Sequence, residues 1–246
     1  MNGGAVTRTL HDARLWVQEG TKLFTEALVG LDERGYVAPS GLPGWTRKHL
    51  VTHVAANADA VGNLVHWAAT GERTPMYSSP EQRGTDIAAG ATRPGAELAR
   101  WFARSAEKLE AAFDALTEEQ WATEVVTAQG RTVPATETPW MRAREVLVHA
   151  VDLGTGVGFA DLPADFLAAL VDDIAGKRSV AAGTPAAGPA LVVEPNDRDH
   201  RWLVTGDGEP VVVTGTLAAV TAYLAGRGHT GVASPERPVP PLPAWL

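Results

Sequence analysis

The sequence predicts an α+β protein in which a four-helix bundle is followed by a smaller α+β domain. Up to residue 154, long segments repeat apolar residues at intervals of three and four, which is typical of amphipathic helices. Beyond that point, short valine-rich runs lie between two helical segments and predict strands. A chain of 246 residues suits one large or two modest domains. We therefore expect domains at residues 1–156 and 157–246.

Composition narrows the range of functions. The chain has 21 Lys and Arg against 29 Asp and Glu, for a net charge of −8, which argues against nucleic acid as a partner. It shows no basic start followed by an apolar run, and no segment reaches the roughly 18 apolar residues of a membrane span. We expect a cytoplasmic protein without a membrane partner. The absence of cysteine excludes thiolate ligands and a cysteine nucleophile.

Four helices are expected in the first domain. Segments 8–31, 46–70 and 93–116 each carry an apolar stripe, and Thr46 is the expected N-cap of the second helix. "TPMYSSPEQRGTD" at 74–86 is expected to be a polar loop. "TEEQ" at 117–120 predicts a capping box that opens a short turn of helix, and "VVTAQGRTVPATE" an irregular or briefly extended segment.

The fourth helix, residues 138–154, completes an antiparallel bundle. Thr138 and Pro139 predict its N-cap and first turn, and the glycines of "GTGVG" predict its end. In the second domain we expect a helix at 163–178, strands in "ALVVEP", "HRWLVTG" and "EPVVVTG", and a helix in "TLAAVTAYLAG". "SPERPVPPLPAWL" forms a proline-rich tail.

The fourth helix, in "WMRAREVLVHAVDLG", carries an unusual set of polar residues. Glu145, His149 and Asp152 are spaced by four and three, so they project from one face. On a buried face they need partners, which could be one another, a neighbouring helix, water or a metal ion. In a chain of this composition, roughly 0.8 pairs with an acidic residue four positions before a histidine are expected by chance. The Glu145/His149 spacing is therefore weak evidence for a metal site by itself.

A second histidine strengthens the metal hypothesis. His53 lies on the inward stripe of the second helix and can face Glu145 and His149, which gives three ligands and an open fourth position. Asp152 could then accept the remaining ring hydrogen of a ligand and fix its tautomer. The alternative is a buried polar network in which Glu145 pairs with Arg142, Arg144 or a histidine and His49 lies at the surface. Spacing leaves both interpretations open.

Two long blocks of the first domain resemble a known family. "GWTRKHLVTHVAANADAVGNLVHWAATGERTPMY" and "TAQGRTVPATETPWMRAREVLVHAVDLG" closely resemble the mycothiol-dependent maleylpyruvate isomerases, whose first domain is a DinB-like four-helix bundle. The resemblance covers residues from about 42 to 154. The second domain is similar more loosely, in "AAVTAYLAGRGHTGV" and the final "PAWL".

The resemblance implies a site and its cofactors. It implies zinc, or another divalent metal, held by His53, Glu145 and His149, with mycothiol as the thiol cofactor. An essential arginine of the family falls on Arg227 in "AGRG". Near the metal helix, the weaker candidates for contacts with the cofactor or substrate are Gln129 and Arg131.

The implied reaction is the cis-trans isomerisation of maleylpyruvate to fumarylpyruvate in gentisate-type aromatic degradation. Rotation about a double bond becomes possible when a thiolate adds, the single bond turns and the thiolate leaves. Because the chain lacks cysteine, the thiol must come from outside, in agreement with mycothiol dependence. Zinc would activate the thiol, and Arg227 would clamp a carboxylate in a cleft between the domains. The expected partners of this monomer are a small diacid and a low-molecular-weight thiol.

Two alternatives remain open at this stage. A zinc-dependent mycothiol S-transferase acting on electrophiles would share the metal ligands but release a stable thioether. A non-catalytic helical-bundle interaction module would bind no metal, or bind it in a closed four-ligand site, and would be indifferent to Arg227→Ala.

Overall fold

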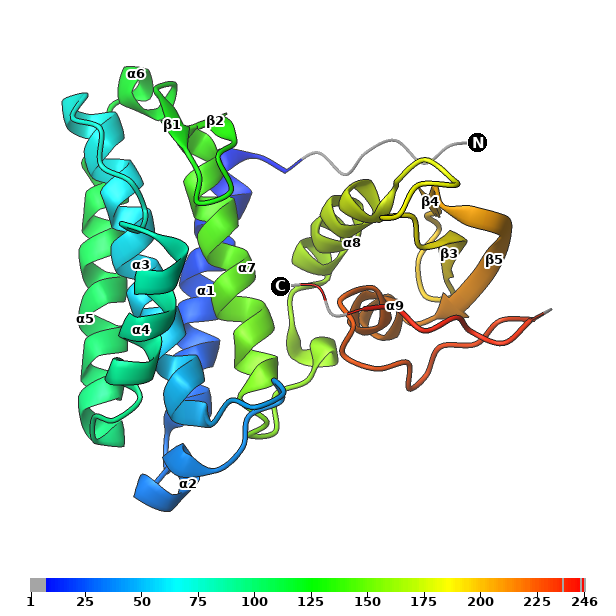
Figure 1. Ribbon diagram of the computed structural model, residues 1–246, viewed down its shortest axis with the longest axis horizontal. Coiled ribbons are helices and arrows are strands. Elements are labelled where there is room, and N and C mark those ends of the chain that lie inside the picture. The colour runs from blue at the N-terminus through cyan, green and yellow to red at the C-terminus, as the bar shows by residue number, and fades with distance from the viewer. Residues whose placement is uncertain (1–7, 236, 244, 246) are drawn as a thin grey trace. The chain divides into compact units, whose positions relative to one another are not determined.

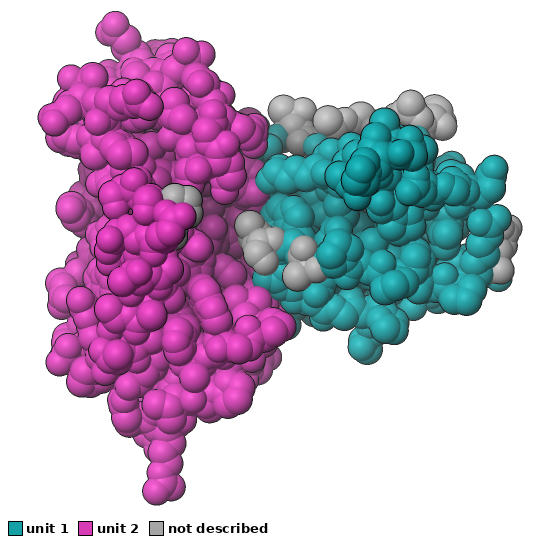
Figure 2. Space-filling model, viewed as in Figure 1, with its two compact units in different colours: residues 1–8, 158–246 teal, residues 9–157 magenta. Residues whose placement is uncertain are grey.

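The computed structural model describes residues 8–235, 237–243 and 245, which form two compact units (Figure 2). One unit comprises Thr9–Val157. The other contains Arg8 and the described residues from Gly158 onward. Helices and short strands together confirm the predicted α+β class. None of the described helices is both long and apolar enough to cross a membrane.

Four long helices lie side by side in the first unit and confirm the predicted bundle (Figure 1). Their bounds are α1 (Leu10–Leu28), α3 (Arg47–Thr70), α5 (Gly95–Asp114) and α7 (Thr138–Asp152). Each buries its apolar stripe, and the rings of Phe24 and Phe102 meet with centroids 4.6 Å apart. A β-carbon on Gly20 would lie 2.5 Å from Val146, so only glycine fits where α1 meets α7.

The helix starts agree with the sequence in one case and differ in another. Thr46 caps α3 as predicted, because its hydroxyl accepts the His49 backbone N–H. The predicted N-cap Thr138 is wrong. Glu137 occupies that position, and the Thr138 hydroxyl instead donates to the Ala135 carbonyl at 2.7 Å. A 3₁₀ turn, η1 (Ala135–Glu137), leads directly into α7 and uses that hydroxyl.

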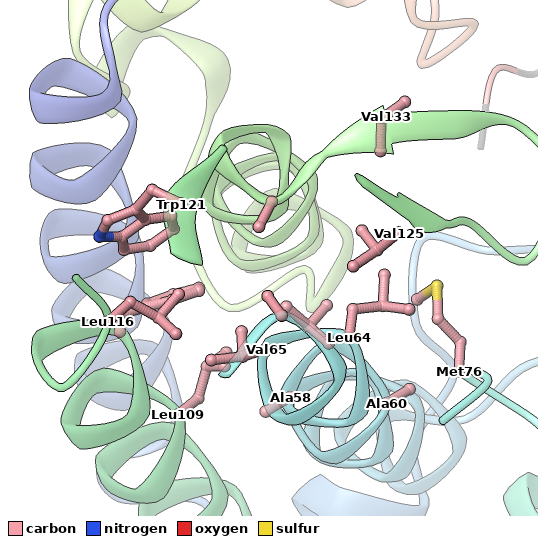
Figure 3. Packing of buried hydrophobic residues seen from close by; sticks show 14 residues of the cluster. Ala58, Ala60, Leu64, Val65, Met76, Leu109, Leu116, Trp121, Val125 and Val133 are labelled. Atoms are coloured by element: carbon pink, nitrogen blue, oxygen red, sulfur yellow. The ribbon is translucent and has the colours of Figure 1, made fainter. Parts of the chain in front are cut away.

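An apolar cluster fills one end of the bundle (Figure 3). Leu64 and Val65 of α3 pack there with Leu109 of α5. The cluster also takes residues from α6 (Glu118–Trp121), whose Thr117–Gln120 capping box confirms the prediction, and from the antiparallel hairpin β1 (Glu124–Val126) and β2 (Thr132–Pro134). The hairpin accounts for the segment expected to be briefly extended, and its core contacts anchor the start of α7.

Two helices were not expected from the sequence. Part of the predicted loop at 74–86 belongs to α4 (Pro80–Gly90), and a short α2 (Glu33–Val37) precedes α3. Ser79 caps α4, because its hydroxyl accepts the Gln82 N–H at 3.1 Å, and Pro80 occupies the first turn. Local capping, rather than an apolar stripe, therefore specifies α4.

The second unit contains the predicted helices and strands. Its elements are η2 (Phe159–Asp161), α8 (Ala164–Arg178), β3 (Pro189–Pro195), β4 (Trp202–Val204), β5 (Asp207–Gly215) and α9 (Leu217–Leu224). The sheet order is β4-β3-β5, with β3 antiparallel to β4 and parallel to β5. The described part of the proline-rich tail is fastened to this unit, since Tyr223 donates its hydroxyl proton to the Pro240 carbonyl at 2.7 Å.

Candidate metal centre and adjoining pocket

Helices α3 and α7 bring three potential metal ligands together. The Glu145 carboxylate lies between two imidazoles, with its Oε2 2.9 Å from His53 Nε2 and 3.3 Å from His149 Nε2. All three ligand atoms lie within 4.8 Å of one another. Residues 145 and 149 share a face of α7 because they are one helical turn apart, as the sequence predicted. His53 comes from the inward face of α3 and is 5% exposed.

The donor set fits a divalent ion. Zinc bound to nitrogen and oxygen at about 2.0 to 2.1 Å in a tetrahedron needs donor atoms roughly 3.3 Å apart. The separations from Glu145, 2.9 and 3.3 Å, require little adjustment to reach that value. Two imidazoles and one carboxylate leave the fourth position to another ligand, as in catalytic rather than structural zinc sites.

Asp152 orients one of the two imidazoles. Its Oδ2 lies 2.8 Å from His149 Nδ1, and both side chains are buried. A carboxylate at this distance accepts the Nδ1 proton and leaves Nε2, the atom that faces Glu145, available as a ligand. Asp152 therefore makes the contact with a ligand candidate that the sequence predicted, and its role in supporting a metal ligand stays a prediction.

His53 is held in a different way. Arg83 Nη2 lies 3.2 Å from His53 Nδ1, and a guanidinium can only donate hydrogen bonds. In this contact Nδ1 must accept, so the ring proton is on Nε2 and is directed at Glu145. The Trp45 ring meets the same imidazole edge to face, with centroids 5.6 Å apart.

Burial and mutual contacts set the charges of the cluster. Burial would raise the pKa of Glu145, but His53 and His149 hold it well below its usual value, so the carboxylate is ionised. Burial would lower the pKa of His149, but hydrogen bonds to Asp152 and Glu145 raise it to about 9. Burial lowers the pKa of His53 despite its contact with Glu145. At neutral pH, in the absence of metal, His149 is thus the protonated, positively charged histidine of the cluster.

The buried Arg142 lies beside the cluster, but the partners of the Glu145 carboxylate are histidines rather than this arginine. Arg142 Nη1 donates to the Val54 carbonyl at 2.7 Å and to Asn57 Oδ1 at 3.0 Å. Burial lowers its pKa to about 10, so it remains a cation at neutral pH. The hydrogen-bond partners of Glu145 are the two histidines, whereas Arg142 ties α7 to the backbone of α3.

A pocket of about 420 Å³ adjoins the cluster within the first unit. His53 forms part of its wall, and the remaining lining comes from α3, α4, α5, the segment before α4 and the turn between α4 and α5. Its size falls in the range of small-molecule sites. Tyr77, Arg83, Arg93 and Trp101 contribute the aromatic and cationic lining. The metal candidate therefore has an adjacent space in which a ligand can be held.

Sequence reasoning missed the α4 side of this pocket. Arg83 lies on a helix that the sequence analysis assigned to a polar loop. A signal was present, because serine followed by proline, glutamate and glutamine is an N-terminal capping pattern. Recognising it would have placed Arg83 on a helix, although its contact with His53 depends on tertiary packing.

The remaining candidates lie outside this pocket. Gln129 and Arg131 are exposed on the turn between β1 and β2. This turn precedes α7 in the sequence, whereas Glu145 and His149 lie in the second half of that helix. Arg227 lies just after α9 in the second unit, where its Nη1 donates to the carbonyls of Ala225 and Trp245. Their assignments as binding or catalytic residues stay predictions.

A helical bundle with a His, Glu, His donor set beside a pocket defines a helical-bundle protein with a candidate metal site. The family model described as the mycothiol maleylpyruvate isomerase N-terminal domain matches residues 17–154. The model described as the MDMPI C-terminal domain matches residues 161–239. The chain belongs to the mycothiol-dependent maleylpyruvate isomerase family.

Solved structures agree with this family over nearly the whole chain. A crystal structure described as the mycothiol-dependent maleylpyruvate isomerase is 42% identical, with a TM-score of 0.90, over 97% of this chain and 100% of that one. A histidine-to-alanine mutant described under the same name is 41% identical, with the same TM-score and coverage. Among curated proteins, the comparison gives no match.

Proposed function

We propose that the protein isomerises maleylpyruvate to fumarylpyruvate with mycothiol as its thiol cofactor and zinc as its metal. The observation that carries the proposal is the cluster of His53, Glu145 and His149, whose ligand atoms lie within 4.8 Å of one another beside a pocket. Family membership supports the substrate and the cofactor. We also retain the cytoplasm as the proposed location.

His53, Glu145 and His149 would hold the metal. When bound, the metal supplies Lewis acidity that lowers the pKa of the mycothiol sulfhydryl, and the resulting thiolate supplies a nucleophile for the conjugated double bond. The chain has no cysteine, so none of its own side chains supplies this nucleophile. The side chains of the protein then hold the metal, orient its ligands and balance its charge.

Individual side chains perform that work. Asp152 holds the proton on Nδ1 of His149, so the proton that His149 would lose on binding a metal is the one on Nε2. Glu145 contributes a negative charge, held on a partly buried carboxylate, that would offset part of the charge of a divalent ion. Trp45 packs edge to face against His53 and so helps to fix the orientation of that ring. These contacts preorganise the site before the substrate binds.

A cation is needed where negative charge develops on the diketo acid. We propose that Arg227 supplies one, as the resemblance implies, through hydrogen bonds from its guanidinium to a carboxylate or enolate oxygen. Its Nη1 donates to backbone carbonyls, and a hydrogen bond to a charged carboxylate would be stronger than one to a neutral carbonyl.

The proposal is tested by the absorbance of maleylpyruvate on zinc-loaded protein with and without mycothiol, with the products separated by chromatography. We expect conversion to fumarylpyruvate only when mycothiol is present, with the thiol recovered unchanged. A stable thioether would identify a thiol transferase instead. No reaction with metal and thiol both bound would refute the isomerase assignment.

A further inference from the structure

We infer that Arg83 of α4 binds a carboxylate of the diacid substrate in the pocket beside His53. This inference rests on the proposed function and assigns a binding residue within the helical unit itself. It starts from the position of Arg83, which lines the pocket and at the same time touches the outer ring nitrogen of a metal-ligand candidate.

The pocket has cationic and acidic groups, and the acidic ones are already engaged. Asp59 accepts a hydrogen bond from the Trp101 indole at 2.9 Å, and Asp86 accepts one from the Gln82 amide at 2.7 Å. Arg93 lies over the Trp101 ring, 4.8 Å from its centroid. The remaining charged group, Arg83, faces the metal candidate.

The guanidinium of Arg83 lacks a charged partner within the described chain. Its contacts are the Nδ1 atom of His53 at 3.2 Å and the side chain of Tyr77, whose ring centroid lies 5.6 Å away and whose hydroxyl it also approaches as a donor. No carboxylate among the described residues forms an ion pair with it. A guanidinium offers five N–H donors in a fork that fits a carboxylate in bidentate fashion. Most of the N–H donors of Arg83 therefore remain available to a ligand in the pocket.

Metal ligation is incompatible with the present contact of Arg83. A neutral imidazole that ligates through Nε2 carries its proton on Nδ1, so Nδ1 of His53 becomes a donor. Arg83 is also only a donor, and two donors facing each other form no hydrogen bond. In the metal-loaded protein Arg83 therefore needs another acceptor within the pocket.

A carboxylate of the substrate satisfies this need in the right place. The proposed substrate is a diacid, and one imidazole ring separates Arg83 from the donor atom of His53. A carboxylate held by Arg83 would place the rest of a small diacid beside the metal candidate. Metal loading and binding of the diacid should therefore favour each other, because each requires Arg83 to leave His53.

The test uses zinc-loaded protein without mycothiol and maleate as an unreactive cis-dicarboxylate probe, with calorimetric titration of four proteins. We expect Arg83→Met to weaken maleate binding about ten- to hundredfold and Arg83→Lys to weaken it less, since lysine keeps the charge but loses the fork. Arg73→Met is the matched control, because Arg73 lies over the Trp67 ring at 5.8 Å but outside the pocket lining. It should bind maleate like the wild type.

A second measurement separates substrate binding from structural support of the metal ligand. Zinc affinity, from competition with a chromophoric chelator, should be unchanged or higher in Arg83→Met, because the competing hydrogen bond to His53 is gone. Loss of zinc affinity with an unchanged melting temperature would make Arg83 a support for His53 and overturn the inference. Maleate affinity equal to that of the wild type would overturn it as well.

The outcome is separable from that of the proposed function. Arg83-dependent maleate binding by a protein that does not isomerise maleylpyruvate would refute the isomerase and leave the carboxylate site standing. Isomerase activity with KM and maleate affinity unaltered in Arg83→Met would refute the carboxylate site alone.

Discussion

Replacing Asp152 by asparagine should weaken metal binding without removing any ligand atom. The carboxylate accepts the Nδ1 proton of His149 at 2.8 Å in a buried setting, and it is what keeps Nε2 available. An amide of the same shape lacks the charge and can present N–H to Nδ1, which favours the wrong tautomer. Loss of such a supporting hydrogen bond typically reduces metal affinity 10- to 100-fold, or by about 1.4 to 2.8 kcal/mol.

The assay for Asp152→Asn is zinc affinity by chelator competition, with circular dichroism to show that the bundle is intact. Asp12→Asn is the matched control, because Asp12 also accepts a local hydrogen bond, from Thr9, but lies at the start of α1. Zinc affinity within twofold of the wild type for Asp152→Asn would refute the reasoning. Equal losses in both variants would point to an indirect effect of removing a carboxylate.

Three further predictions concern ligands, turnover and packing. His53→Ala and His149→Ala should each lose zinc and isomerase activity, and retained stoichiometric zinc in both would refute the ligand assignment. Arg227→Ala should keep zinc but lose turnover, measured by metal analysis and the absorbance assay; unchanged kcat would contradict its role. Gly20→Ala should lower the free energy of unfolding by about 1 to 3 kcal/mol in urea, because the added methyl group meets α7 side chains at 2.5 Å. Gly62→Ala, with nothing within 4 Å of the new methyl, should instead raise it by up to about 1 kcal/mol.

Much of the candidate site could be predicted from the sequence because it depends on helical periodicity. The spacing of Glu145, His149 and Asp152 places them on one face of any straight helix, so their proximity is a local property. His53 lies on the inward stripe of its own helix, and a bundle brings such stripes together. The bundle itself was predictable for the same reason. The spacing of apolar residues indicates both that a segment is helical and which of its faces is buried.

Other features depended on interactions that periodicity does not report. Within residues 81–90 of α4, whose burial is described, only Ile87 and Gly90 are buried, so this part of the helix has little apolar stripe and the helix is marked mainly by its cap. Arg83 lines the pocket because α4 packs against α3, and this tertiary contact cannot be read from the sequence pattern. The start of α7 was misplaced because η1 uses the hydroxyl of Thr138, and sequence patterns do not distinguish that use from capping.

Charge balance explains why the site combines a glutamate with a buried arginine. In the metal-free protein, negative charges on Glu145 and Asp152 are offset by Arg142 and by protonated His149, so these four charges sum to zero. Arg83 beside His53 adds a further positive charge, which a carboxylate of the substrate would offset. Exchange of the His149 proton for a divalent ion would leave one excess positive charge in a poorly hydrated region. A thiolate ligand removes that excess, whereas a neutral thiol does not. With a metal bound, the charges of these side chains would therefore favour a deprotonated thiol ligand, and a third histidine in place of Glu145 would leave these groups with a net positive charge even with the thiolate bound.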